Sequence, residues 1–175
     1  MSDNKDNNGA GNVSPADAVN NITTGNVSPA DTQVNMTELV LPNDTNLLGN
    51  LLGGRLLHWI DIVGALAATR HARMPVATVA IESVDFRHPI RKGEMVVLNA
   101  RVIWTGRTSM KVRVQAITEN LYTGAVIVTN NALLTYVAMN ESETPQPVPK
   151  IQPKTGEDFE LYKNAQDEYN KLHNK

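Results

Sequence analysis

The feature that most restricts how this chain can fold is a long apolar stretch that contains a single acid. Between Gly54 and Ala68 apolar residues occupy nearly every side of a helical wheel, and Asp61 lies in the middle of the stretch. A helix that is apolar nearly all round is normally buried. A carboxylate inside a core is costly unless a partner stabilises it or a reaction uses it. Asp61 is therefore the first candidate functional residue, with a purely structural acid as the alternative.

Two glycines, Gly53 and Gly54, open the same predicted helix. The backbone N–H groups of a first helical turn have no partner inside the helix, and the positive end of the helix dipole lies there. Gly54 and Asp61 are seven residues, or two turns, apart, so they lie on one face about 10 Å apart at ~1.5 Å per residue. A carbonyl oxygen held at the helix start and an acid further along suggest hydrolytic chemistry.

Composition narrows the class of protein. The 175 residues suffice for one domain of ordinary size plus tails, and a net charge of −2 gives no sign of a nucleic-acid-binding face. The absence of cysteine excludes disulfides, thiolate metal sites and a cysteine nucleophile, and four scattered histidines do not predict a metal site. Neither a signal segment nor an apolar run of ~20 residues is present, so we expect a cytoplasmic protein that does not bind membranes.

Residues 1–35 differ in composition from the rest of the chain. They are rich in Asn, Asp, Gly, Ser and Thr, and they lack aromatic residues. Such a segment buries too little apolar surface to offset the entropy lost on ordering, so we predict a disordered tail over 1–35. Within it, the sequence from Gly11 to Asp17 recurs from Gly25 to Asp31, and two copies are too few for a repeat architecture.

The remaining periodicity predicts an α+β fold over residues 36–140, followed by a proline-rich loop and a C-terminal helix over 141–175. The pattern changes from helical to alternating after Met74-Pro75. The expected strands cover 37–41, 77–86, 94–104, 110–116 and 125–139, and the expected helices cover 54–71 and 157–172. The last helix carries an apolar stripe that includes Phe159.

One strand, one very hydrophobic helix and an antiparallel meander predict a hot-dog fold. In that architecture a curved antiparallel sheet of about five strands wraps round one long buried helix. A single small sheet leaves its edges unpaired and cannot cover both sides of the helix. Because sheet extension is a common remedy for an unpaired edge, we expect a homodimer.

Several motifs resemble those of the hot-dog acyl-CoA thioesterases. They lie in the stretches 42–61, 78–86, 89–93, 106–110 and 134–137, and the resemblance covers roughly residues 36–172. It is strongest toward bacterial acyl-CoA hydrolases and the brain-type cytosolic acyl-CoA hydrolase. The resemblance implies hydrolysis of acyl-CoA to free fatty acid and CoA, in at least a homodimer, with a trimer of dimers as the larger assembly.

The resemblance also implies roles for individual residues. It places the essential acid at Asp61 and a polar partner at Asn46, contributed by different subunits. Asp61 as a carboxylate can activate a water or attack the thioester directly, and the Gly54 N–H can stabilise the oxyanion. Asn50 is a weaker alternative to Asn46.

The turn that contains Arg107, Thr108 and Ser109 offers a guanidinium group, two hydroxyls and backbone N–H groups suited to phosphate, with an ordinary polar hairpin as the alternative. The family's use of this loop implies that it binds the CoA phosphates. No cofactor is expected apart from the CoA that the substrate itself carries. Two other functions stay open, a non-catalytic acyl-CoA sensor and a hot-dog hydratase or dehydratase. The second uses a histidine in its site, and no histidine is placed convincingly beside Asp61 in the sequence.

Overall fold

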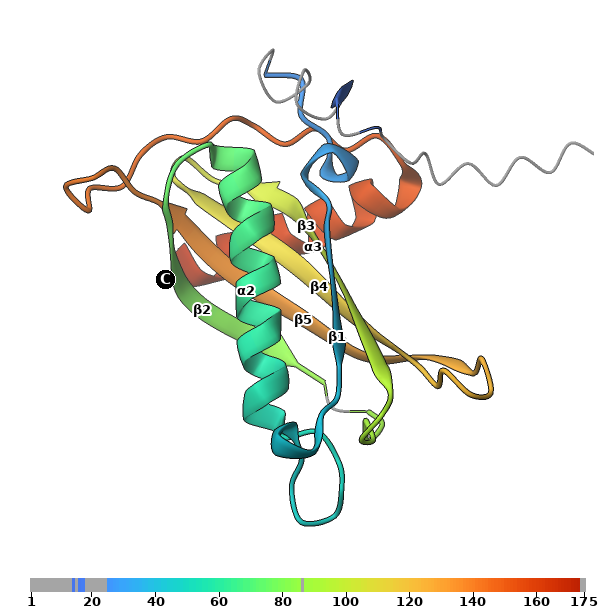
Figure 1. Cartoon of the computed structure of the whole chain (residues 1–175). Coiled ribbons are helices and arrows are strands. Elements are labelled where there is room, and N and C mark those ends of the chain that lie inside the picture. Colours follow the sequence, from blue (N-terminus) through green and yellow to red (C-terminus); the bar gives the residue numbers. More distant parts are fainter. Residues whose placement is uncertain (1–13, 15, 18–24, 86, 174–175) are drawn as a thin grey trace, which may run out of the picture.

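Five antiparallel strands form one twisted sheet with a long helix on each of its two faces (Figure 1). This computed structural model describes residues 14, 16–17, 25–85 and 87–173. The strand order is β1-β3-β4-β5-β2, so β1 and β2 are the two edges. In chain order the elements are η1 (Pro29–Thr32), β1 (Val34–Leu39), η2 (Pro42–Asp44), α2 (Gly53–Ala72), β2 (Val76–Val84), β3 (Met95–Thr105), β4 (Ser109–Glu119), β5 (Val126–Ala138) and α3 (Gly156–His173).

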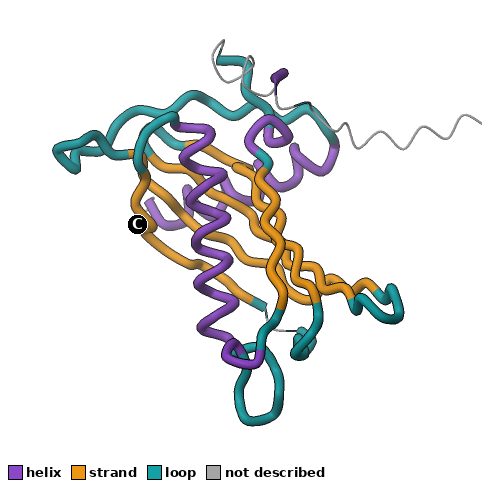
Figure 2. Tube along the Cα trace, viewed as in Figure 1, coloured by secondary structure: helices purple, strands orange, loops and turns teal. Residues whose placement is uncertain are grey.

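The predicted α+β hot-dog architecture is confirmed, and the predicted strand and helix boundaries differ from the observed ones by a few residues. Helix α2 crosses one face of the sheet, as the tube view shows (Figure 2). Its inward side chains pack on residues from the centre of the sheet; the most buried include Ile60, Val63, Leu98, Val112 and Leu134. Alternate residues of β3 and β4 face this core, which explains the period of two in their sequences.

The expectation that α2 is buried on all sides is wrong for a single chain. The sheet covers one side of the helix, while Ile62 and Leu66 on the opposite side are exposed. A helix apolar nearly all round needs a cover on both sides, and five strands of one chain cover only one. The uncovered side of α2 is therefore available for a second chain.

Helix α3 covers the other face of the sheet. Trp104 on β3 stacks on Tyr169 of α3 with ring centroids 4.7 Å apart, and its indole N–H donates to Gln166. Lys111 of β4 is almost fully buried here, paired with Glu82 of β2 at 2.7 Å and Glu168 of α3 at 3.0 Å. The prediction that Phe159 belongs to the buried stripe is wrong, because its side chain is largely exposed.

The ordered part of the chain begins earlier than predicted. Val27 is completely buried, and its carbonyl accepts a hydrogen bond from the Gln152 N–H at 2.7 Å. The turn η1 follows, closed by the Asp31 carboxylate, which accepts hydrogen bonds from the backbone and the hydroxyl of Ser28. The predicted disorder of 1–35 is therefore wrong for 25–35, where tertiary contacts offset the entropy of ordering. For 1–13, 15 and 18–24, which lie outside the described residues, it stays a prediction.

The anchored N-terminal segment generates a prediction about stability. The Thr32 hydroxyl is buried and accepts a hydrogen bond from the Val102 N–H at 2.9 Å. Thr32→Val keeps the shape of the side chain but leaves that buried N–H without its partner, which costs ~1–3 kcal/mol. We expect this loss in the free energy of unfolding measured with urea. Thr37→Val, at an exposed position of β1, is the control; equal midpoints for both variants would contradict the anchoring role.

Candidate active site

The carboxylate of Asp61 is oriented by hydrogen bonds from two strands. The Thr78 hydroxyl of β2 donates to Oδ1 at 2.8 Å, and the Tyr136 hydroxyl of β5 lies 3.2 Å from the same oxygen. Within the described part of the chain, no group donates to Oδ2. Asp61 is half-buried rather than sealed in the core as expected, because it meets the sheet at the edge strand β2. One carboxylate oxygen is thus held, and the other is free to act on a ligand.

Neither Thr78 nor Tyr136 was assigned a role from the sequence, although both lie within the motifs that carry the family resemblance. Burial and the neighbouring Asp61 carboxylate raise the pKa of Tyr136 well above its usual value. The phenol therefore stays protonated and serves as a donor to Asp61. Both residues lie far from Asp61 in the sequence, and only the pairing of β2 with β5 brings them together.

The first turn of α2 presents free backbone donors. The Arg55 and Leu56 N–H groups bond back to the Leu52 carbonyl, and no acceptor in the described ranges of the chain pairs with the N–H groups of Gly53 and Gly54. Both glycines are exposed, and a Cβ at Gly54 would meet no atom within 4 Å. The helix start can therefore approach an oxygen of a ligand closely, as expected for Gly54.

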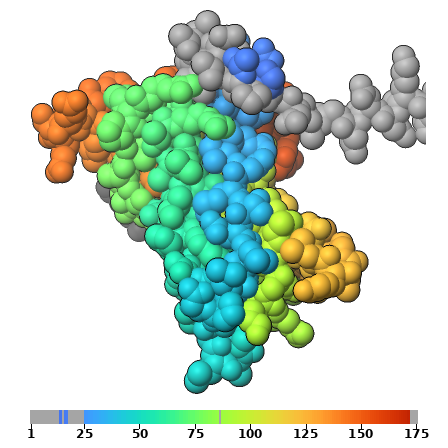
Figure 3. Space-filling view, in the orientation of Figure 1, coloured from blue at the N-terminus to red at the C-terminus, as the bar shows by residue number. Residues whose placement is uncertain are grey.

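The loop that carries Asn46 projects beyond the start of α2, at the lower end of the molecule in the space-filling view (Figure 3). The Asn46 side-chain oxygen accepts hydrogen bonds from the N–H groups of Leu48 at 2.9 Å and Asn50 at 3.2 Å. The amide NH₂ group is thus the part of Asn46 left for a ligand. Leu47 and Leu48 at the tip of the loop are almost fully exposed. The tip of the loop is therefore apolar and open to solvent.

A buried acid that the sequence did not single out ties this loop to the helix. Asp44 forms an ion pair with Arg55 on the first turn of α2, with 2.7 Å between Asp44 Oδ1 and Arg55 Nε. Its carboxylate also accepts a hydrogen bond from the Leu41 N–H. Its backbone carbonyl also accepts the Leu52 N–H at 2.9 Å. Asp44 is almost fully buried, so the Asn46 loop and the start of α2 are fixed relative to each other. A separation of eleven residues along the chain gives no local signal for this pair.

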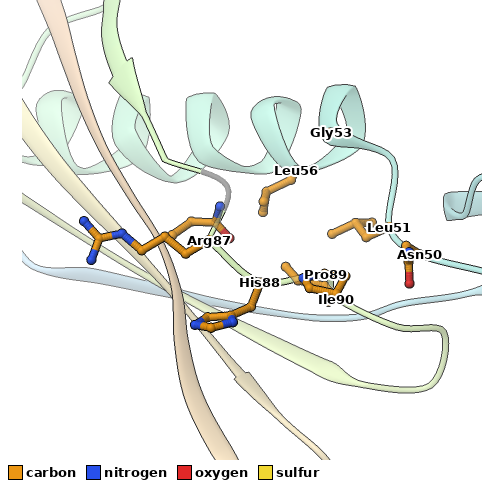
Figure 4. Close-up of a pocket in the computed structure, with 9 residues that line it drawn as sticks. Asn50, Leu51, Gly53, Leu56, Arg87, His88, Pro89 and Ile90 are labelled. Atoms are coloured by element: carbon orange, nitrogen blue, oxygen red, sulfur yellow. The ribbon is translucent and has the colours of Figure 1, made fainter.

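A cavity of about 270 Å³ opens beside the start of α2 (Figure 4). Its apolar lining includes Leu51, Leu56 and Ile90, and the exposed residues Arg87 and His88 also line it. Gly53 and Asn50 belong to the lining, whereas Asp61 does not. The cavity is therefore suited to an apolar group whose polar end lies at the free N–H groups of the helix.

The predicted CoA-binding turn lies at the opposite end of the sheet, next to the loop that precedes α3. The Arg107 carbonyl accepts the Val148 N–H at 3.0 Å, and the Lys150 ammonium donates to the Gly106 carbonyl at 2.8 Å. Arg107 is exposed and Thr108 and Ser109 are half-buried. Lys150, which the sequence did not indicate, adds a second cation to this turn.

Within one chain the predicted site residues do not form one cluster. In the described structure no hydrogen bond joins Asn46 to Asp61, and the turn at 107–109 lies beyond the other end of α2. Nor do three or more His, Asp or Glu side chains gather there in a group that would hold a metal ion. No helix among the described residues has the length and hydrophobicity needed to cross a bilayer.

Comparison with known proteins identifies the family. The model of the Thioesterase superfamily matches residues 48–125. The acyl-CoA thioester hydrolase YkhA of Bacillus subtilis, itself uncharacterized, is 37% identical over 143 residues, which span 82% of this chain and 83% of that protein. This chain belongs to the hot-dog acyl-CoA thioesterase family. A solved hexameric acyl-CoA thioesterase shares 42% identity with this family member at a TM-score of 0.78, over 80% of this chain and 90% of the other.

A third relative bears on individual residues of this hot-dog thioesterase. The acyl-CoA hydrolase of Staphylococcus aureus, solved with butyryl coenzyme A, is 29% identical at a TM-score of 0.77, over 83% of this chain and 88% of the other. Its solved alanine variants replace an asparagine, an aspartate fifteen residues later and a threonine seventeen residues after that. The same residue types occur here at the same spacing, as Asn46, Asp61 and Thr78.

A buried histidine lies near the turn of Arg107, Thr108 and Ser109 and makes stability depend on pH. His71, at the end of α2, is fully buried, and its Nε2 lies 2.8 Å from the Pro149 carbonyl, to which it donates. Burial lowers the pKa of His71 below its ordinary value of 6.5. Below that pH the unfolded chain binds a proton that the folded chain does not, so His71 makes stability fall as the pH falls.

We therefore expect the free energy of unfolding of His71→Gln to depend less on pH than that of the unaltered protein. Urea unfolding at several pH values between about 7.5 and 5.5, a range that brackets the ordinary histidine pKa, measures how the free energy of unfolding of each protein changes with pH. His58→Gln, at an exposed position of the same helix, is the control. Parallel slopes for His71→Gln and the unaltered protein would be the contrary result.

Proposed function

We propose that this protein hydrolyses acyl-CoA thioesters to a free fatty acid and CoA. The observation that carries the proposal is the Asp61 carboxylate, with Oδ1 held by Thr78 and Tyr136 and Oδ2 unbonded among the described residues. An oriented, half-buried carboxylate with one unbonded oxygen is placed to act on a ligand rather than to stabilise the core. The acyl-CoA hydrolase relatives and the shared spacing of Asn46, Asp61 and Thr78 support the same role.

The proposed reaction uses the groups described above. Asp61 takes a proton from water, whose oxygen attacks the thioester carbon, or the carboxylate attacks that carbon itself and water then hydrolyses the anhydride. The Gly54 N–H and the Asn46 NH₂ group donate to the oxygen that becomes negative. The carbon–sulfur bond breaks, and CoA leaves as a thiolate that takes up a proton. One water is consumed, and no cofactor takes part.

The geometry of α2 favours a site shared between two copies of the chain. Gly54 and Asp61 lie about 10 Å apart along the helix axis, whereas an oxyanion donor bonds the carbonyl oxygen directly and a base reaches the carbonyl carbon directly or through one water. This separation favours a donor and an acid that come from different chains at one thioester. We propose that Asn46 and Gly54 of one copy act with Asp61 of another.

The surface around Asp61 supports this sharing. On α2, Ile62 and Leu66 are exposed, and on the neighbouring edge strand β2, Val79 and Ile81 are exposed too. An edge strand with apolar side chains is a template for pairing with a second chain. Pairing of two β2 strands would cover this surface in a homodimer, and the hexameric relative supports a further assembly of three such dimers.

The two ends of the substrate fit the two ends of the molecule. We propose that the acyl chain enters the cavity beside Leu51, Leu56 and Ile90, with its carbonyl at the helix start. The phosphates of CoA would bind at the turn of Arg107, Thr108 and Ser109, where the Lys150 ammonium adds positive charge.

The hydrolysis itself is tested by replacing the acid. We expect Asp61→Asn to lower the rate of CoA release by roughly 10²–10⁴-fold, since that is the usual contribution of a general base. Release is followed with a thiol reagent on a series of acyl-CoAs, and binding of CoA is measured separately. Asp167→Asn, on the exposed side of α3, is the matched control. Binding of acyl-CoA without release by the unaltered protein would support a sensor instead.

The shared site is tested by mixing two inactive variants. If Asn46 and Asp61 act from different copies, a dimer of one Asn46→Ala chain and one Asp61→Asn chain contains one intact site and one doubly altered site. Unfolding and refolding an equal mixture should then restore about a quarter of the unaltered activity, since half of the dimers are mixed. A mixture as inactive as its components would contradict the sharing but not the role of Asp61.

A further inference from the structure

The hydroxyl of Tyr136 contacts Asp61 at two different atoms. It lies 3.2 Å from the carboxylate oxygen Oδ1 and 3.0 Å from the backbone carbonyl oxygen of Asp61. The ring of Tyr136 is completely buried between β5 and α2. Because the hydroxyl contacts both the side chain and the backbone of Asp61, it fixes the position of the carboxylate relative to the helix backbone.

Gly64 makes room for this hydroxyl one turn after Asp61. A Cβ added at Gly64 would lie 2.4 Å from the Tyr136 hydroxyl oxygen and 3.2 and 3.3 Å from two carbons of the ring. The ring is rigid and its surroundings are packed, so it cannot move aside without disturbing the core. Only glycine at position 64 lets the hydroxyl reach Asp61.

We infer that Tyr136 and Gly64 form a positioning pair that fixes the orientation of the Asp61 carboxylate. This inference rests on the proposed role of Asp61 in hydrolysis. Thr78 alone holds Oδ1 from β2, and it lies at an exposed position of an edge strand. From the buried side, the Tyr136 hydroxyl shares its one hydrogen between Oδ1 and the Asp61 backbone carbonyl, so that together with Thr78 it fixes Oδ1 and leaves Oδ2 unbonded among the described residues.

The first test removes only the hydroxyl. Tyr136→Phe keeps the buried ring, and we expect kcat for acyl-CoA to fall roughly 10- to 100-fold, as for a misplaced catalytic group. KM should stay within about twofold, because Tyr136 binds no part of the substrate in the proposed site. Tyr162→Phe on α3 removes a hydroxyl at a half-buried position away from Asp61 and is the matched control. Unchanged kcat in folded Tyr136→Phe would overturn the inference.

The second test uses the contact between the two residues. Gly64→Ala should lower both kcat and the unfolding temperature, because its methyl group displaces the Tyr136 hydroxyl. The double variant Gly64→Ala/Tyr136→Phe lacks the hydroxyl oxygen that the new methyl group would meet most closely. Its kcat should therefore match that of Tyr136→Phe, and its unfolding temperature should exceed that of Gly64→Ala. If the kcat loss of the double variant equals the product of the losses of the two single variants, the two residues do not act through one contact. A Gly64→Ala variant with unaltered kcat would show the same.

The outcomes separate this inference from the proposed function. An active Asp61→Asn variant would remove the role of Asp61 and the positioning pair together. An inactive Asp61→Asn variant with fully active Tyr136→Phe would overturn the positioning pair alone. Should Tyr136→Phe not fold, Gly64→Ala tests the same contact with the tyrosine retained, with loss of kcat at unchanged KM as the supporting result.

Discussion

The packing of α2 on one face of the sheet is the contact on which the other features depend. It buries the apolar side chains of a helix that has almost no polar face, and it brings Asp61 against β2 and β5. Because the sheet covers only one side, the same helix also presents apolar side chains to the outside. A single element thereby forms the core, carries the candidate acid and supplies a surface for a second chain.

Most of the fold could be predicted from periodicity. The change from a helical to an alternating pattern separated α2 from the four strands that follow, and the resemblance to hot-dog thioesterases gave their arrangement. The ordered structure of residues 25–35 could not be predicted in this way, since it depends on the burial of Val27 beside Ile151. Local composition describes the chain alone and does not show a contact made 124 positions away, at residue 151.

The candidate site was predictable only in part, for a related reason. Asp61 could be found because an acid in an apolar helix breaks a pattern, and Asn46 because the family motif contains it. Thr78, Tyr136 and Asp44 break no pattern in their own segments. Their importance comes from strand pairing and from loop closure, which place side chains together that are remote in the sequence.

The half-buried ion pair between Asp44 and Arg55 has a consequence for how two sites are connected. It joins the loop of Asn46 and the first turn of α2 into one rigid unit. In a twofold assembly with shared sites, the unit from each copy completes the site that contains the other copy's acid. A substrate that pulls on one loop would then shift the helix that holds the opposite acid. Each rigid unit would thereby connect the donors of one thioester site with the acid of the other.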